Sequence, residues 1–93
     1  MFSWDARKAL SNLKKHNVSF VEGATVFADP EGLDWDDFEH SLSEWRSSRL
    51  GFSAMGRILL VIYTIRELKY GKETIRIISA RQATRKERQA YAG

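Results

Sequence analysis

The chain of 93 residues contains no cysteine and only one proline. Without a thiol it cannot form a disulfide-stabilised scaffold, and it cannot hold zinc or an iron-sulfur cluster through cysteine. A reducing compartment, the cytoplasm, is therefore the natural location. A charged fraction of 29% stands beside an aromatic fraction of 12%. That supply of large apolar side chains is enough to offset chain entropy, so we expect an ordered domain.

Long apolar runs are also lacking. The longest, Ile58 to Tyr63, has six residues, whereas a membrane-spanning helix needs roughly 20. Arg7 and Lys8 are not followed by the apolar stretch of a secretion signal. We therefore expect no membrane span and no export signal, and the length predicts one small domain over residues 1–93. A glycine-rich phosphate loop and a G-x-S-x-G motif are missing too, which leaves nucleotide hydrolases and triad enzymes without support.

The net charge of +3 is divided unevenly along the chain. Residues 1–45 contain four basic and nine acidic side chains, a net charge of −5, whereas residues 46–93 contain eleven basic and three acidic ones, a net charge of +8. Eight of those eleven are arginine, whose planar guanidinium suits bidentate phosphate contacts and base stacking. A polyanion is one expected partner, and a merely soluble basic surface is the other interpretation.

The first third of the sequence predicts a short strand and two helices. Residues 2–4 alternate apolar and polar side chains, which is typical of a strand. Apolar positions spaced by three and four predict a helix over residues 6–16, with Asn17 as a left-handed terminator. A Ser-x-x-Glu capping box then opens a second helix at residues 20–28, which ends before an Asp-Pro pair.

The remainder predicts a sheet and a last helix. Residues 30–44 indicate a loop or an irregular edge strand. Segments of strand character follow at residues 45–52, 57–66 and 74–80, and the glycine-containing turns between them favour an antiparallel meander. Another capping box opens a helix at residues 85–91. We therefore predict an α+β fold in which a short N-terminal strand and two helices pack on a three- to four-stranded antiparallel sheet, with a short C-terminal helix.

Cationic and aromatic side chains gather within eleven positions at the end of the chain: Arg81, Arg85, Lys86, Arg88 and Tyr91. Arg88 and Tyr91 share one helix face because they are three residues apart. The start of that helix also offers free amides to an anion. The cluster indicates a phosphodiester site; the alternative is a solvated basic helix whose Tyr91 packs on the sheet.

Histidines and acidic residues supply fewer candidates. In an extended segment, His40 would bring a base close to Glu44 and to a phosphate contact from Arg46. His16 is explained more simply as a cation at a helix C-terminus. The carboxylates between positions 34 and 39 match no calcium loop or octahedral site, so we predict no metal site and no cofactor.

Aromatic residues fall into two groups. Three of them, Trp35, Phe38 and Phe52, lie in polar surroundings and fit a partner surface, provided that the folded chain does not bury them. Six more are most simply core residues: Phe2, Trp4, Phe20, Phe27, Trp45 and Tyr63.

With these segments in place, nearly the whole chain resembles the BrnT family of type II toxin-antitoxin toxins, small ribonucleases with a RelE-like fold. The N-terminal half carries the resemblance in Phe2-Ser-Trp-Asp5, Asn12-Leu-Lys-Lys-His16, Val18-Ser-Phe20, Ala24-Thr-Val-Phe27, Asp29-Pro30 and His40-Ser41 with Glu44 and Arg46. The C-terminal half carries it in Gly51, Gly56-Arg57, Val61-Ile-Tyr-Thr64 with Arg66, Ile75-Arg-Ile-Ile-Ser-Ala-Arg81, Ala83, Glu87-Arg88 and Tyr91. The chain departs from the family at Asn17, where glycine is usual, and at Phe52 and Met55, where arginine is common. The loop between residues 67 and 73 is also longer.

The resemblance implies a ribonuclease that cleaves RNA and inhibits translation. It further implies a BrnA-type antitoxin with a ribbon-helix-helix part, a complex with two copies of each protein, and contact with operator DNA only through the antitoxin. Metal-free RNA cleavage needs a base for the 2′-hydroxyl, a charge stabiliser for the phosphorane and a proton for the 5′ oxygen.

On that chemistry, each candidate residue receives an expected role. Arg81 and Arg88 are the expected charge stabilisers, His40 or Glu87 the base, and Tyr91 a residue that stacks on a base. The remaining RNA contacts are expected from Arg57, Arg66, Arg76, Arg85 and Lys86. The alternative function is a non-catalytic RNA- or ribosome-binding module, or a degenerate toxin that only binds its antitoxin.

Overall fold

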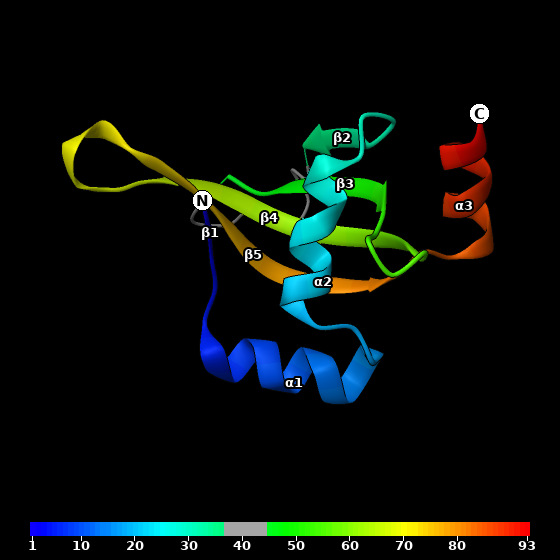
Figure 1. Cartoon of the computed structure of the whole chain (residues 1–93), viewed down its shortest axis with the longest axis horizontal. Helices are drawn as coiled ribbons and strands as arrows, with labels where there is room; N and C mark the ends of the chain where they lie inside the picture. The colour runs from blue at the N-terminus through cyan, green and yellow to red at the C-terminus, as the bar shows by residue number, and fades with distance from the viewer. Residues whose placement is uncertain (37–44) are drawn as a thin grey trace.

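The computed structural model describes residues 1–36 and 45–93, whose strands form one mixed sheet in the order β1-β5-β4-β3-β2 (Figure 1). The strands are β1 (Phe2–Ser3), β2 (Leu33–Asp36), β3 (Ser47–Phe52), β4 (Ile58–Glu67) and β5 (Glu73–Gln82). β2, β3, β4 and β5 pair antiparallel with one another in turn, whereas β1 pairs parallel with β5. The hairpin of β4 and β5 passes through the 3-10 turn η2 (Lys69–Gly71) and extends beyond the other strands (Figure 1).

The predicted helix boundaries near the N-terminus follow from side-chain caps. α1 (Ala6–His16) begins where the Asp5 carboxylate accepts from the Lys8 amide at 3.0 Å, and it ends at Asn17 with a positive φ of 56°. α2 (Phe20–Thr25) begins at Ser19 and continues as the 3-10 turn η1 (Val26–Ala28). Among the described residues, no helix is both long and apolar enough to cross a membrane.

α1 and α2 cover one face of the sheet and enclose the main core. Its buried members are Val18, Phe20, Val26, Leu59, Val61, Ile77 and Ala80. α2 approaches β5 closely at Gly23, where an added Cβ would lie 3.1 Å from the Cβ of Ala80. A small residue is therefore required at position 23.

The opposite face of the sheet is covered only at one end within the described part of the chain. α3 (Arg85–Ala92) follows β5 directly, and its capping box joins Thr84 and Glu87 as predicted. Strand alternation turns Leu60 away from the helix-covered side. There it forms a second cluster with Leu50 and Ala83, against which Tyr91 packs. Because α3 has only eight residues, this packing is what stabilises it.

The prediction of a three- to four-stranded antiparallel sheet was wrong at one edge, because the sheet has a fifth strand and is mixed. β1 adds a parallel strand at one edge, where the Ile75 amide donates to the Met1 carbonyl at 2.9 Å. At the opposite edge, β2 is an antiparallel strand, inside the segment for which a loop or an irregular edge strand was predicted. Both pairings join residues far apart in sequence, so no local pattern reveals them.

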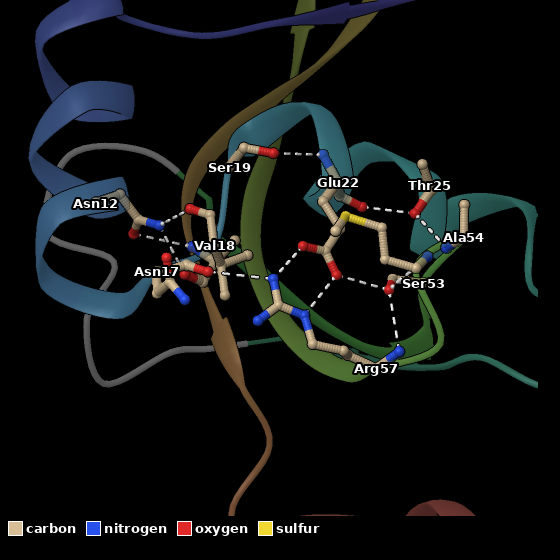
Figure 2. Close-up of polar contacts among 11 residues, drawn as sticks. Asn12, Asn17, Val18, Ser19, Glu22, Thr25, Ser53, Ala54 and Arg57 are labelled. Carbon is tan, nitrogen blue, oxygen red and sulfur yellow. Dashed lines mark hydrogen bonds and ion pairs between the residues drawn. The ribbon is translucent and has the colours of Figure 1, made fainter.

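A buried polar network ties both helices to the sheet (Figure 2). Asn12 donates to the Val18 and Ala80 carbonyls at 3.0 and 2.7 Å and accepts from the Ala80 amide. The Glu22 carboxylate, 4% exposed, accepts from Ser53 Oγ at 2.7 Å and from Arg57 Nε at 2.9 Å, and it forms a further ion pair with Arg57 Nη2. Asn12, Glu22 and Arg57 therefore have structural partners on the helix-covered side.

Candidate functional site

An ion pair between Arg81 and Glu87 marks the junction of β5 and α3. Arg81 Nη1 and Nη2 donate to the two Glu87 carboxylate oxygens at 2.7 and 3.0 Å. Glu87 also accepts from the Thr84 amide at 2.8 Å. Its hydrogen bonds from Arg81 are the main cause of a pKa below the usual range, so Glu87 is ionised at neutral pH. The Arg81 side chain remains 35% exposed.

Arg81 also lines a pocket on the open face of the sheet. This pocket has a volume of about 400 Å³, and we call it the sheet pocket. Its lining combines cationic and hydroxyl groups with an apolar floor: Trp35, Arg46, Ser48, Leu60, Ile62, Ile78, Ser79 and Arg81. A phosphate or a polar planar ligand entering it would meet guanidinium donors at its rim.

A second pocket, of about 380 Å³, lies between α3 and the β2 edge, and we call it the helix pocket. It is lined by Leu33, Trp35, Leu50, Thr84, Lys86, Glu87 and Ala90. Trp35 borders both pockets and is 45% exposed, so the folded chain does not bury it. The Arg81–Glu87 pair also joins the pockets, since Arg81 lines one and Glu87 the other.

The cationic residues of α3 surround this junction. Arg85, Lys86 and Arg88 are exposed. Arg88 Nη1 donates to the Ala83 carbonyl at 2.9 Å, which holds the guanidinium beside the loop between β5 and α3. The structure thus brings Arg81, Arg88 and Glu87 together with the predicted RNA contacts of α3.

Tyr91 lies near the C-terminal end of α3, where its contacts stabilise the fold. Its hydroxyl donates to Asp29 Oδ2 at 2.5 Å, and its ring packs against the second cluster. This hydrogen bond is the main cause of a raised Tyr91 pKa and of a lowered Asp29 pKa. Asp29 also accepts from the Phe52 amide at 2.8 Å, so it links α3 to the end of β3. Sequence reasoning missed Asp29 because this contact spans 62 positions.

Three predicted RNA contacts lie away from the junction. Arg57 is on the helix-covered side, paired with Glu22. Arg76 and Arg66 lie farther along the β5–β4 hairpin, with Arg76 five residues before Arg81. A register shift opposite Ile62 and Tyr63 places one extra residue in β5 between Arg76 and Arg81, which allows both to lie on the same face. Since Ile77 points into the helix-covered core, alternation places Arg76 on the open face. A chain of phosphates lying along the sheet would reach it.

His40, Glu44 and Phe38 lie outside the described residues. Trp35 and Arg46, on either side of that segment, both line the sheet pocket. Ser48 and Ser79 line it too, and nothing in their sequence context indicated this. In residues 1–36 and 45–93, no group of three or more His, Asp or Glu side chains is placed to hold a metal ion. The groups gathered here can bind phosphate, stabilise developing negative charge and contact planar apolar surfaces.

Comparison with known proteins identifies the family. The family model described as the ribonuclease toxin BrnT of type II toxin-antitoxin systems matches residues 4–87. A crystal structure of the Brucella abortus ribonuclease toxin BrnT has a similar fold, with a TM-score of 0.64 and 22% sequence identity over 91% of this chain and 99% of that one. No curated protein sequence matches the chain. Because the family model covers most of its length, the chain belongs to the BrnT family of ribonuclease toxins of type II toxin-antitoxin systems.

Proposed function

We propose that this ribonuclease toxin is a metal-independent endoribonuclease that cleaves messenger RNA and thereby stops translation in the cytoplasm. The observation that carries the proposal is the Arg81–Glu87 pair at the edge of an open pocket on the sheet. A guanidinium fixed in this way offers a permanent positive charge for a phosphate, without the need for a bound cation.

The hydrogen bonds of Arg81 leave one side of its guanidinium for a substrate. Glu87 takes one N–H from Nη1 and one from Nη2, and the Gln82 carbonyl accepts from Nη1 at 3.2 Å. Of the five N–H groups of an arginine, the donors that remain are Nε–H and one N–H of Nη2. These two lie along one edge of the guanidinium. That edge suits bidentate binding of two phosphate oxygens.

In the proposed reaction, the RNA 2′-hydroxyl loses a proton and attacks the adjacent phosphorus, and the bond to the 5′ oxygen breaks as that oxygen gains a proton. Arg81 and Arg88 stabilise the phosphorane charge. Arg85 and Lys86 of α3, with Arg57, Arg66 and Arg76, remain the proposed backbone contacts. Tyr91 remains a proposed base contact, which would require its ring to leave the second cluster and its hydroxyl to leave Asp29.

The base is proposed as His40 or Glu87. Glu87 is the weaker base of the two, because Arg81 and the Thr84 amide stabilise its ionised form. Its geometry supports a second role, which is to fix the orientation of Arg81. A positioning role for Glu87 leaves proton removal to His40.

An antitoxin partner follows from membership in a toxin-antitoxin family. We propose that it is a BrnA-type protein with a ribbon-helix-helix part, in a complex with two copies of each chain that contacts operator DNA through the antitoxin alone. We also propose that residues 1–93 form a single domain of the RelE-like class. The family assignment supports these proposals, and the mass of the isolated complex tests the proposed two copies of each chain.

The test compares Arg81→Ala, Arg81→Lys and Arg88→Ala with the control Arg7→Ala, an exposed arginine at the start of α1. We expect growth arrest and new RNA 5′-hydroxyl ends from the wild type and the control, in EDTA as well as in magnesium. The Arg81→Ala and Arg88→Ala variants should lose both effects while remaining folded. Unchanged toxicity in both variants would refute the roles proposed here, and RNA binding without cleavage by the wild type would favour the non-catalytic module.

A further inference from the structure

Trp35 is an exposed aromatic residue on β2, a strand that is anchored on both sides of it. Its two neighbours in β2 are anchored on the other side of the strand: Asp34 binds Arg49 and accepts from the Tyr63 hydroxyl at 2.6 Å. Asp36 accepts from Trp45 Nε1 at 3.0 Å. With both carboxylates fixed, strand alternation directs the Trp35 side chain to the open face, opposite Ser48 of β3. Because β2 is held on both sides of Trp35, the ring can be presented on the open face without rearrangement of the strand.

Trp35 stands between two pockets of similar size, both of which border the Arg81–Glu87 pair. We propose that the sheet pocket and the helix pocket receive the bases of two consecutive nucleotides of single-stranded RNA, with Trp35 as the stacking surface between them. This inference rests on the proposed ribonuclease function, because it places the phosphate that joins the two nucleotides at Arg81.

The lining of each pocket fits a nucleobase, which has apolar faces and polar edges. In the sheet pocket, Leu60, Ile62 and Ile78 form an apolar floor, and Arg46 and Arg81 supply donors at the rim. Because the remaining donors of Arg81 are assigned to the phosphate, the sheet pocket should accept a base mainly through its apolar face.

The helix pocket is chemically different. Leu33, Leu50 and Ala90 make most of it apolar, and the polar groups come from Thr84, Lys86 and Glu87 at the start of α3. We expect this pocket to accept a base mainly by surface contact, with little discrimination.

The geometry of the two pockets requires single-stranded RNA. Bases in a duplex are stacked and paired, so they cannot enter two pockets on a protein surface, whereas unpaired bases splay out and stack on aromatic side chains. Trp35 is thus assigned as a positioning and specificity residue. It places the nucleotides on each side of the scissile phosphate.

The kinetic test uses Trp35→Ala and Trp35→Phe, with Phe52→Ala as a matched control. Phe52 is also an exposed aromatic residue, at 50%, and it lines neither pocket. On short single-stranded RNA, Trp35→Ala should lower kcat/KM by about tenfold or more, the effect of losing one stacked base. Trp35→Phe should retain most of the activity, and Phe52→Ala should match the wild type.

A base-deletion cycle separates stacking from a change in structure. The substrate carries an abasic nucleotide immediately 5′ or 3′ of the cleaved bond. If Trp35 stacks on that base, the abasic RNA lowers kcat/KM of the wild type. It lowers kcat/KM of Trp35→Ala only slightly, so the two proteins should cleave the abasic RNA with nearly equal kcat/KM. Equal losses from base deletion in both proteins would overturn the proposal, as would unchanged cleavage sites and kcat/KM in a folded Trp35→Ala variant.

A binding test distinguishes failure of this inference from failure of the ribonuclease proposal. The tryptophan fluorescence that the wild type has and the Trp35→Phe variant lacks reports stacking on Trp35, and this comparison leaves the Trp45–Asp36 hydrogen bond in place. Single-stranded RNA should quench this fluorescence, and duplex RNA of the same length should not. If the wild type binds and quenches without cleaving, the ribonuclease chemistry is wrong and the base pockets stand. If single-stranded RNA leaves the fluorescence unchanged while the antitoxin alters it, the pockets belong to the protein partner.

Discussion

The stability of the folded chain depends on the ionised carboxylate of Glu22, which is buried and paired with Arg57. We consider the substitution Glu22→Gln, which keeps the size of the side chain and removes its charge. The carboxylate is buried and accepts from Ser53 and from two nitrogens of Arg57. After substitution, the Arg57 guanidinium faces a neutral amide, and part of its hydrogen bonding is lost.

The expected loss is about 2–3 kcal/mol in the free energy of unfolding. Removing one partner of a fully buried pair costs about 3–5 kcal/mol. The lower figure applies here because the Arg57 side chain is 26% exposed and water compensates part of the loss. For a domain of this size, each kcal/mol corresponds to roughly 4–8 °C in Tm, so we expect a decrease of about 8–24 °C.

Urea unfolding at several pH values measures this loss. Arg57 lowers the pKa of Glu22 in the folded protein below the ordinary value of 4.5. The stabilising effect of the charge is therefore fully present above pH 4.5 and is lost as the pH falls through the lower folded pKa. The difference between wild type and Glu22→Gln should accordingly shrink toward pH 3.

The control for this measurement is Glu31→Gln, at an exposed glutamate, which should change the free energy of unfolding by less than about 0.5 kcal/mol. A loss below about 1 kcal/mol at pH 7 would refute the role assigned to the buried pair. A loss that is the same at pH 3 and pH 7 would show that the charge of Glu22 is not its source.

Two further predictions concern contacts between distant parts of the chain. Asn12→Ala should lower the free energy of unfolding by about 3 kcal/mol, because it leaves the carbonyls of Val18 and Ala80 and the amide of Ala80 without partners. Urea unfolding measures this loss, with Ser11→Ala at an exposed neighbouring position as the control. Equal stability of the two variants would contradict the prediction. Tyr91→Phe should speed amide hydrogen exchange in α3 and leave β4 protected, since it removes the bond to Asp29; unchanged exchange in α3 would show that ring packing alone holds the helix.

The elements that could be predicted from the sequence are those fixed by nearby residues. α1 begins and ends where Asp5 and Asn17 indicated, because a helix cap acts within three or four positions. The same holds for α3 and its capping box. In the site, the pattern placed Arg81 in a basic cluster and Glu87 in a capping box, and the pairing of their side chains came only from the structure.

The remaining features depend on contacts between distant residues. β1 and β2 occupy the two sheet edges, and neither shows a pattern strong enough to predict its partner. Trp45 was expected in the core, yet it is 56% exposed, because β3 begins only at Ser47. The joint position of Trp35 between two pockets depends on the β2–β3 register, which local periodicity does not determine.

The pairing of β1 with β5 affects the order in which this toxin folds during synthesis. β1 and α1 are made first, yet the strand against which they pack is complete only at Gln82. The hairpin of β4 and β5 is joined by a short connection and can form before any contact with the N-terminus. The N-terminal helices therefore cannot pack on the complete sheet until the residues up to Gln82 have left the ribosome.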